Sequence, residues 1–394
     1  MQSVNENSYH FNLHGIVGLK LVNPSAADLK EFNNSFSEFA VHDEIASDIV
    51  IKFVGKIETT NLKYIGLNDA AFDNDGYYIL STGRNKFKAK VPFDQIDNQL
   101  EILCENGSSE IPYLHYFINL FFLKKNYIPL HASAFRFNNQ TALVMGWSKG
   151  GKTESLLSFA KKGAEYVGDE TVIISNDGET VFGIPVPVCV WEWQFKQIPE
   201  LMPNLPLQKK VIFSLIHLVD WFYKFLKKTF LKKSFITKIF SEALPAFKRQ
   251  LNIKLDPRKI FKSNIVKGKI PLDKIILIMS HNSSEIIITK CEIDEVINRM
   301  ISSQEYEFNS FMGYYAKFKF AFPDRKSHLL ESLNQIQFKL LNEVFKGKSA
   351  FKVTHPYPVS FDKLFDVMKS IFEKDNSSLE TKSDLLQRES NIKS

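Results

Sequence analysis

Residues 141–163 read TALVMGWSKGGKTESLLSFAKKG, and this stretch decides the fold. Its centre, residues 146–153, matches the phosphate-binding loop pattern G-x-x-x-x-G-K-[ST] in full. Glycines permit a tight turn whose backbone N–H groups converge on phosphate oxygens. The lysine adds a charge for the β- and γ-phosphates, and the threonine hydroxyl suits a Mg²⁺ ion. The predicted phosphate-binding residues are Gly146, Ser148, Lys149, Gly150, Gly151, Lys152 and Thr153.

The flanks of this loop predict a strand before it and a helix after it. The apolar run 141–145 is typical of a buried strand, and Leu156, Leu157 and Ala160 share one helix face. Gly163 stands where a helix C-cap is expected. A helix N-terminus directed at the loop would complete an anion site. The alternative is a glycine turn that binds nothing.

A second signal is the acidic pair Asp169–Glu170 inside the β-rich run 164–174, AEYVGDETVII. Carboxylates that interrupt a buried strand are costly unless they meet a cation or take part in chemistry. Such an acid could hold Mg²⁺ or accept a proton from an attacking hydroxyl. The alternative is an exposed Gly-Asp-Glu turn between two strands.

Residues 131–174 resemble the C-terminal catalytic domain of HPr kinase/phosphorylase, a family of the phosphoenolpyruvate-carboxykinase-like P-loop group. The resemblance combines the loop with His131 before it, Glu154 directly after its threonine, and the acidic pair. It implies that Thr153 and Asp169 hold Mg²⁺ and that Glu154 supports the metal shell and the nucleotide site.

The resemblance also implies the catalytic roles. An acid of the pair Asp169/Glu170 would act as general base, and His131 would lie beside the transferring phosphate. Taken alone, a histidine after the apolar run 127–130 is also compatible with a packed, hydrogen-bonded core residue. Arg258, beside a proline turn, is the candidate cation for transition-state charge, and the alternative for it is an ordinary surface arginine.

We therefore expect a kinase that uses ATP (or GTP) and Mg²⁺ and transfers the γ-phosphoryl group to a hydroxyl. The acceptor would be a serine-like group of a protein, a peptide or a small molecule. The alternative is a non-catalytic, nucleotide-binding regulatory module. A carboxykinase-type reaction would need further metal ligands and an arginine set that the sequence does not identify.

Composition limits the class of protein. The 394 residues are 44% hydrophobic and 24% charged, with a net charge of +6, so the total does not suggest nucleic-acid binding. Three scattered cysteines fit a reducing compartment, and the first residues have no signal-peptide pattern. No apolar run reaches the roughly 18–20 residues of a membrane span. These features predict a cytoplasmic protein.

The chain organisation predicts an α/β protein, and the resemblance implies a phosphoenolpyruvate-carboxykinase-like core. Residues 1–110 alternate apolar and polar residues and predict a β-rich N-terminal module. Residues 111–374 would form the catalytic domain, beginning with an apolar helix over 111–130 packed on its sheet. The polar tail 375–394 is predicted to be disordered.

The end of the catalytic domain is predicted from two further segments. Residues 271–303 read strand, turn, strand, helix, and 350–372 read strand, loop, helix. The stretches VWEW (190–193) and HPYPVS (355–360) are similar to stretches in related kinase-like proteins. The helices with which the family recognises HPr have no identified counterpart, so HPr is not the expected substrate.

A basic helical insertion is predicted at about residues 205–250. Between 208 and 240, bulky apolar residues alternate with polar positions that are mostly lysines. Such a helix can lie peripherally on an anionic membrane surface or bind an acidic partner. The alternative is an ordinary insertion whose apolar stripe packs on the core and whose lysines are solvated. The oligomeric state is left open.

Overall fold

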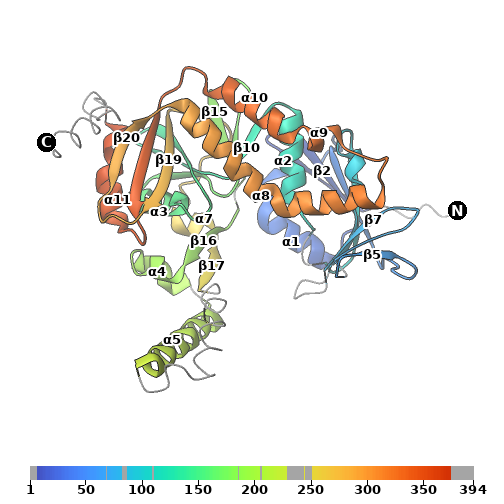
Figure 1. Ribbon diagram of the computed structural model, residues 1–394, viewed down its shortest axis with the longest axis horizontal. Helices are drawn as coiled ribbons and strands as arrows, with labels where there is room; N and C mark the ends of the chain where they lie inside the picture. The colour runs from blue at the N-terminus through green and yellow to red at the C-terminus, as the bar shows by residue number, and fades with distance from the viewer. Residues whose placement is uncertain are drawn as a thin grey trace.

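The computed structural model describes residues 7–67, 69–81, 87–108, 111–184, 186–204, 206–228, 244 and 251–373. They form a mixed α/β protein with several sheets, as predicted, in which an N-terminal lobe and a second lobe lie side by side and an arm projects from the second lobe (Figure 1). The predicted tail 375–394 and most of 229–250 lie outside the described residues. Within the described parts, no helix is long and apolar enough to cross a membrane.

The N-terminal lobe is built on one nine-stranded sheet, in the order β3-β1-β2-β4-β9-β8-β7-β6-β5. Its inward-facing residues are fully buried, as the alternating sequence pattern requires. Helix α1 (Ala26–Phe36) begins with a capping box in which the Ser25 and Asp28 side chains satisfy each other's backbone N–H groups. The strands are β1 (Ser8–Leu13), β2 (Val17–Val22), β3 (Ala40–Val41), β4 (Ile49–Val54), β5 (Lys63–Ile65), β6 (Ala70–Phe72), β7 (Tyr77–Ser81), β8 (Phe87–Lys90) and β9 (Leu100–Glu105).

The second lobe is built on a six-stranded sheet, in the order β13-β11-β12-β19-β21-β20, whose three consecutive strands β12, β19 and β21 are parallel. Alternate residues of the middle strands enter two different cores, because both faces of the sheet are covered. Helices α3 (Lys152–Ala160) and α11 (Phe361–Met368) pack together on one face. The strands are β11 (Ser133–Phe137), β12 (Gln140–Met145), β13 (Glu165–Gly168), β19 (Lys274–His281), β20 (Ile287–Cys291) and β21 (Ala350–Pro356).

The predicted element order of this lobe is confirmed around the loop and near the C-terminal end. The loop lies between β12 and α3, 274–303 form strand, turn, strand and helix, and 350–372 form strand, loop and helix. A smaller sheet, in the order β10-β14-β15-β18, lies beside it. Its strands are β10 (Ile128–Leu130), β14 (Val172–Ile174), β15 (Thr180–Gly183) and β18 (Ile270–Pro271).

The apolar helix predicted over 111–130 is shorter than expected. Helix α2 spans Leu114–Lys124 only, because Asn126 takes a left-handed conformation with φ of 60° and the chain continues as strand β10. The helix packs against β10 of the smaller sheet and against β2 of the N-terminal lobe. The Phe117 ring contacts the rings of Phe93 and Phe311, and Lys124 binds backbone carbonyls before β9.

The long helix α8 (Ile293–Ala321) connects the two lobes (Figure 1). Its first half passes the loop, and its second half buries Phe311, Tyr315 and Phe318 against aromatic residues of the N-terminal lobe. The following helices are α9 (His328–Glu331) and α10 (Leu333–Phe345). Asp97 accepts hydrogen bonds from the backbone N–H groups of His328 and Leu329. The two lobes therefore share one continuous core.

The arm carries the predicted basic insertion. The two-stranded sheet of β16 (Val188–Trp191) and β17 (Asn252–Leu255) leads away from the second lobe and continues into α4 (Glu192–Phe195) and α5 (Leu207–Lys228). The helical prediction is confirmed for 207–228. After β17, the chain returns through the short helix α7 (Pro257–Ile260).

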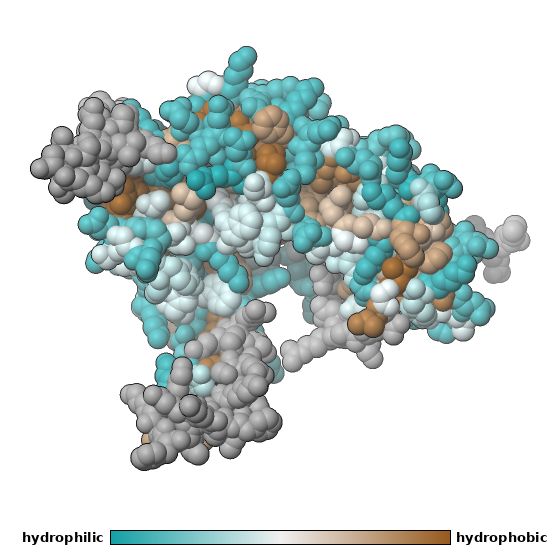
Figure 2. Space-filling model, viewed as in Figure 1, coloured by the Kyte–Doolittle hydropathy of each residue, from teal (hydrophilic) through white to brown (hydrophobic). Residues whose placement is uncertain are grey.

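The face of the body in Figure 2 is mostly hydrophilic, with its apolar residues in small groups.

Candidate phosphate-binding site

The loop between β12 and α3 has glycines where the surrounding atoms leave no room for a side chain. A Cβ atom on Gly146 would lie 2.3 Å from the carbonyl oxygen of Ile278. A Cβ on Gly151, whose φ is 116°, would lie 2.1 Å from Nε2 of His355. The Ile278 carbonyl oxygen and the His355 ring therefore pack closely against these glycines on one side of the loop. A ligand would approach the loop from its other side.

His355 supports the loop from the end of β21, and the sequence analysis did not identify it. The side chain is fully buried, and its Nε2 lies 3.0 Å from the carbonyl oxygen of Gly150. Its Nδ1 lies 2.8 Å from the carbonyl oxygen of Pro356. Because β12, β19 and β21 are parallel neighbours, their carboxyl ends meet at this edge, which brings the HPYPVS stretch to the loop.

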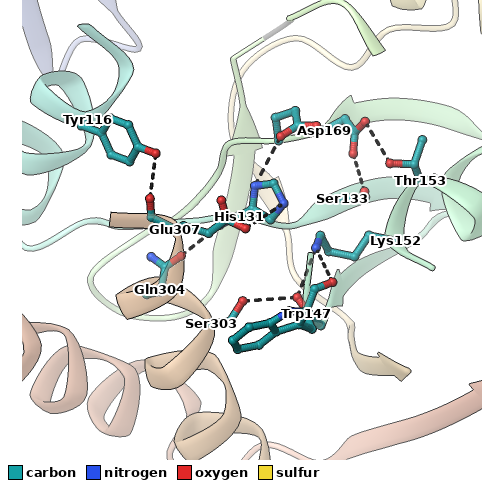
Figure 3. A network of polar contacts seen from close by, with 12 residues as sticks. Tyr116, His131, Ser133, Trp147, Lys152, Thr153, Asp169, Ser303, Gln304 and Glu307 are labelled. Carbon is teal, nitrogen blue, oxygen red and sulfur yellow. Dashed lines mark hydrogen bonds and ion pairs between the residues drawn. The ribbon is translucent and has the colours of Figure 1, made fainter. Parts of the chain in front are cut away.

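Lys152 is the first residue of α3, and its side chain is buried against the loop. Its Nζ donates to the carbonyl oxygens of Gly146 at 3.1 Å and Trp147 at 3.0 Å (Figure 3). Burial lowers the pKa of Lys152, and the charges of the surrounding carboxyl groups, Glu170 first, raise it again. The ammonium group is thus held among acids at the mouth of the loop.

Asp169 lies in the turn between β13 and β14, so the predicted interruption of the strands is a turn. Its side chain is nevertheless only 2% exposed. The Ser133 hydroxyl donates to Oδ1 at 2.5 Å, and the Thr153 hydroxyl lies 3.5 Å from Oδ2 (Figure 3). Burial, reinforced by the charge of Glu170, raises the pKa of Asp169 to about 7. The alternative of an ordinary exposed turn therefore does not describe Asp169, because its carboxyl group is buried beside the loop threonine.

Glu170 and His131 face each other beside Asp169. Glu170 is half-exposed with a left-handed φ of 66°, and its Oε2 lies 3.3 Å from Nδ1 of His131. Burial, with a further contribution from the Lys152 charge, lowers the pKa of His131 to about 3, so its imidazole is neutral. On the other side, Nε2 of His131 lies 3.8 Å from a carboxylate oxygen of Glu307 on α8.

Glu154, the first helical acid after the loop threonine, is 7% exposed and faces the same space. Gln194 on α4 donates to its Oε1 at 3.1 Å. Burial raises the pKa of Glu154. The glutamine comes from the arm, so the arm contributes to the wall of the site.

These groups line one pocket of about 360 Å³. It unites eight of the predicted residues, namely His131, Ser148, Lys149, Lys152, Thr153, Glu154, Asp169 and Glu170. The other lining residues were not predicted: Cys189, Trp191, Gln194, Glu307 and Tyr357. The Lys149 ammonium lies over the Trp191 ring at 5.8 Å.

A second pocket of about 480 Å³ adjoins the first and shares four lining residues with it, including Glu170 and Glu307. It reaches the N-terminal lobe, because Ser35 in the last turn of α1 and His115 on α2 line its far side. Both acids of the pair therefore line the loop pocket, and Glu170 also lines the space between the two lobes.

Arg258 is not brought to the loop pocket. Asp256 caps α7, and the Arg258 guanidinium turns back to it, with 2.8 Å between Nη2 and Oδ2. A second acid, Glu38 of the N-terminal lobe, lies 3.9 Å away. Arg258 lines a separate pocket beside α1, where its charge is compensated by these acids.

The donor set fits a Mg²⁺–nucleotide complex. In the part of the chain that the structure describes, no three histidine, cysteine or acidic side chains form a metal cage. Mg²⁺ is commonly held by one or two protein oxygens together with phosphate oxygens and water. Thr153 and Asp169 supply such oxygens, and the excess of acids over lysines in the pocket favours a cation.

Comparison with known proteins adds no assignment. No protein-family model matches the chain, and no curated protein shows significant sequence similarity to it.

Proposed function

We propose that the protein is an ATP-dependent (or GTP-dependent) kinase of the HPr-kinase-like type that transfers the γ-phosphoryl group to a hydroxyl. The observation that carries the proposal is the contact between Thr153 of the loop and the buried Asp169, in one pocket with Lys152. A lysine and several acids are buried together beside the loop, and burying charged groups costs stability. This arrangement is not expected of a glycine turn that binds no ligand.

The loop would bind the nucleotide phosphates. Its backbone N–H groups and the N-terminus of α3 would surround the phosphates, and Lys152 would exchange its two carbonyl partners for phosphate oxygens. Thr153 and Asp169 would hold Mg²⁺, which would neutralise charge on the β- and γ-phosphates.

Glu170 would be the general base. Glu170 and Glu307 both line the two pockets, and Glu170 is the one next to Asp169, so a hydroxyl approaching from the space between the lobes would meet it before the loop. The pKa of Glu170 is raised because the pocket removes part of the water around its carboxyl group, although about half of the side chain stays exposed, and this brings proton acceptance closer to neutral pH. The neutral His131 would orient Glu170 through the 3.3 Å contact with Nδ1.

The second pocket would hold the acceptor. Its lining is mixed, with the ring of Tyr116, the amide of Asn119 and the ammonium of Lys254 among its groups, and the N-terminal lobe provides part of it. This gives the N-terminal lobe a role in acceptor recognition. The acceptor itself stays open among proteins, peptides and small molecules.

The test is incubation of the protein with γ-labelled ATP, Mg²⁺ and a lysate or metabolite extract of the source organism. A kinase would move the label to a protein, peptide or small molecule, and the same mixture with heat-inactivated protein would not. Tight ATP binding without any transferred label would favour the alternative, a non-catalytic nucleotide-binding module. No ATP binding would contradict both.

A further inference from the structure

Helix α5 is attached to the arm by a narrow inner side. Phe213 and Ile216 are its buried residues, each 6% exposed, and Phe213 belongs to the core of the second lobe. Two polar contacts add to this attachment: Nε2 of His217 lies 3.2 Å from Glu192, and Lys209 donates to the carbonyl of Asn252. These contacts fix the helix while using little of its circumference.

The outer side of α5 carries a row of exposed apolar side chains, which we call the outer row. Its members are three, four or seven residues apart, so they lie on one helix face. They are between 51% and 77% exposed and comprise Leu207, Val211, Leu215, Leu218 and Phe225. Trp221 lies next to the row, 62% exposed, with its ring stacked on that of Phe225 at 5.9 Å.

This row differs from the scattered apolar residues on the body surface. Single exposed apolar residues are normal, whereas a contiguous exposed row marks a contact surface. The visible face of the body shows its apolar groups separated by hydrophilic ones (Figure 2). In Figure 1 the helix lies away from both lobes at the end of the arm.

The charge of α5 indicates what covers the row. The helix has five lysines, Lys209, Lys210, Lys224, Lys227 and Lys228, and one acid, Asp220, which lies 2.8 Å from Lys224. Lys210 and Lys228 follow Leu207 and Phe225 by three residues, so their positions border the row at both ends of the helix. If two copies of the chain met through this face, their lysines would come close together and repel each other.

We propose that the outer row of α5 binds the surface of an anionic lipid bilayer. The apolar row would enter the boundary between headgroups and acyl chains, the lysines would reach the anionic headgroups, and Trp221 would lie at headgroup level. This is peripheral binding, in agreement with the lack of a membrane-spanning helix among the described residues.

Vesicle flotation of the full chain tests the proposal. The protein should float with vesicles of phosphatidylcholine and phosphatidylglycerol and bind pure phosphatidylcholine vesicles much more weakly. The double variant Leu215→Glu/Leu218→Glu should bind at least about a hundredfold more weakly, because two apolar side chains are lost from the bilayer. Leu67→Glu, at a leucine exposed on the N-terminal lobe, is the matched control and should bind like the parent chain.

Two further readouts separate lipid from other occupants. Lys210→Glu/Lys228→Glu should weaken binding by on the order of tenfold or more at low salt and by less at high salt. Trp221→Phe should keep binding but lose the fluorescence blue shift that anionic vesicles cause. Lys152→Ala should bind vesicles normally, so failure of the proposed kinase function would not affect the result.

The proposal is overturned if the parent chain does not float with anionic vesicles, or if Leu215→Glu/Leu218→Glu floats as well as the parent. It is also overturned if the parent sediments as a dimer that the same variant dissociates while vesicle binding is absent, because the row would then join two copies. Unchanged melting temperatures for all variants would show that the changes act on binding and not on folding.

Discussion

The candidate phosphate-binding pocket and the outer row of α5 depart from the usual distribution of residues in opposite directions. In the pocket, charged side chains are buried: Lys152, Glu154 and Asp169 are all less than 10% exposed. On α5, leucines and aromatic residues are exposed instead. Both arrangements cost stability compared with the reverse placement. Both arrangements therefore support the proposals that a nucleotide binds in the pocket and a membrane surface binds the outer row.

The two regions differ in how firmly they are held. The pocket lies at the ends of parallel strands in a continuous core, with His355 below the loop and Gln194 beside Glu154. Among the contacts described for helix α5 are two buried apolar side chains and the 3.2 Å contact of His217 with Glu192. A catalytic pocket has to hold reacting groups in position, whereas a membrane-binding surface needs less rigid support. The difference between the two regions agrees with the two proposals.

The largest effect is expected from removing the buried charge of the loop. Lys152→Ala should lower the affinity for Mg²⁺–ATP by on the order of a thousandfold, because the phosphates lose a buried ionic partner. Isothermal titration calorimetry measures this directly. Lys149→Ala, an exposed lysine of the same loop, is the matched control and should change the affinity less than about tenfold. Equal losses in the two variants would remove the distinction between buried and exposed charges.

The next effect concerns the support under the loop. Gly151→Ala should lower the free energy of unfolding by about 2–5 kcal/mol, because it combines left-handed strain with a clash against His355. Gly163→Ala is matched, since Gly163 also has a positive φ but has nothing within 4 Å of an added Cβ. It should cost only about 1–2 kcal/mol. Urea unfolding of both variants gives the comparison, and equal costs would contradict the tight packing by His355.

A smaller effect is expected in the pH dependence of stability. The folded-state pKa of Asp169 is about 7, above its usual value of 3.8, so between about pH 4 and pH 7 the unfolded chain releases a proton that the folded protein keeps. Its stabilising contribution is therefore full at low pH and is lost as the pH rises through 7. In Mg²⁺-free buffer, Asp169→Asn should flatten this fall by on the order of 1–3 kcal/mol.

Urea unfolding of the parent and Asp169→Asn at a series of pH values measures the effect. Asp362→Asn, which alters an acid exposed on α11, should leave this part of the profile unchanged. Parallel profiles for the parent and Asp169→Asn would mean that the burial of Asp169 does not raise its pKa.

The smallest effect is expected on α5. Leu218→Ser should change the free energy of unfolding by less than about 0.5 kcal/mol, because Leu218 is exposed. Leu156→Ala, which removes a fully buried leucine of α3, should cost about 2–5 kcal/mol. Thermal and urea unfolding measure both changes. A cost for Leu218→Ser close to that of Leu156→Ala would show that the outer row is covered within the folded chain.

Local sequence signals predicted the elements that hold the loop. The glycine pattern, the run 141–145 and the acidic pair are short-range features, and the structure brings Lys152, Thr153 and Asp169 into one pocket. The helix over 111–130 was predicted too long because a purely apolar run does not show where Asn126 turns the chain.

Residues that reach the pocket from distant elements could not be found in this way. His355, Gln194 and Glu307 arrive through strand order and helix packing, which a sequence pattern does not encode. Glu307 left no trace in the pattern, because it lies in a mostly polar part of α8, where residues 302–310 read SSQEYEFNS. Arg258 was chosen for its charge alone, and the neighbouring Asp256 holds its side chain elsewhere.

The central claim is that the acids beside the loop act on a phosphate held by it. Its most direct test is the ratio of γ-phosphoryl transfer to ATP binding for the parent chain, Asp169→Asn and Glu170→Gln, measured with γ-labelled ATP and the labelled acceptor fraction. We predict that both variants bind ATP within about tenfold of the parent and transfer at least about a hundredfold less. Transfer at the parent rate by either variant would contradict the role proposed for that acid, and transfer at the parent rate by both would contradict the claim itself.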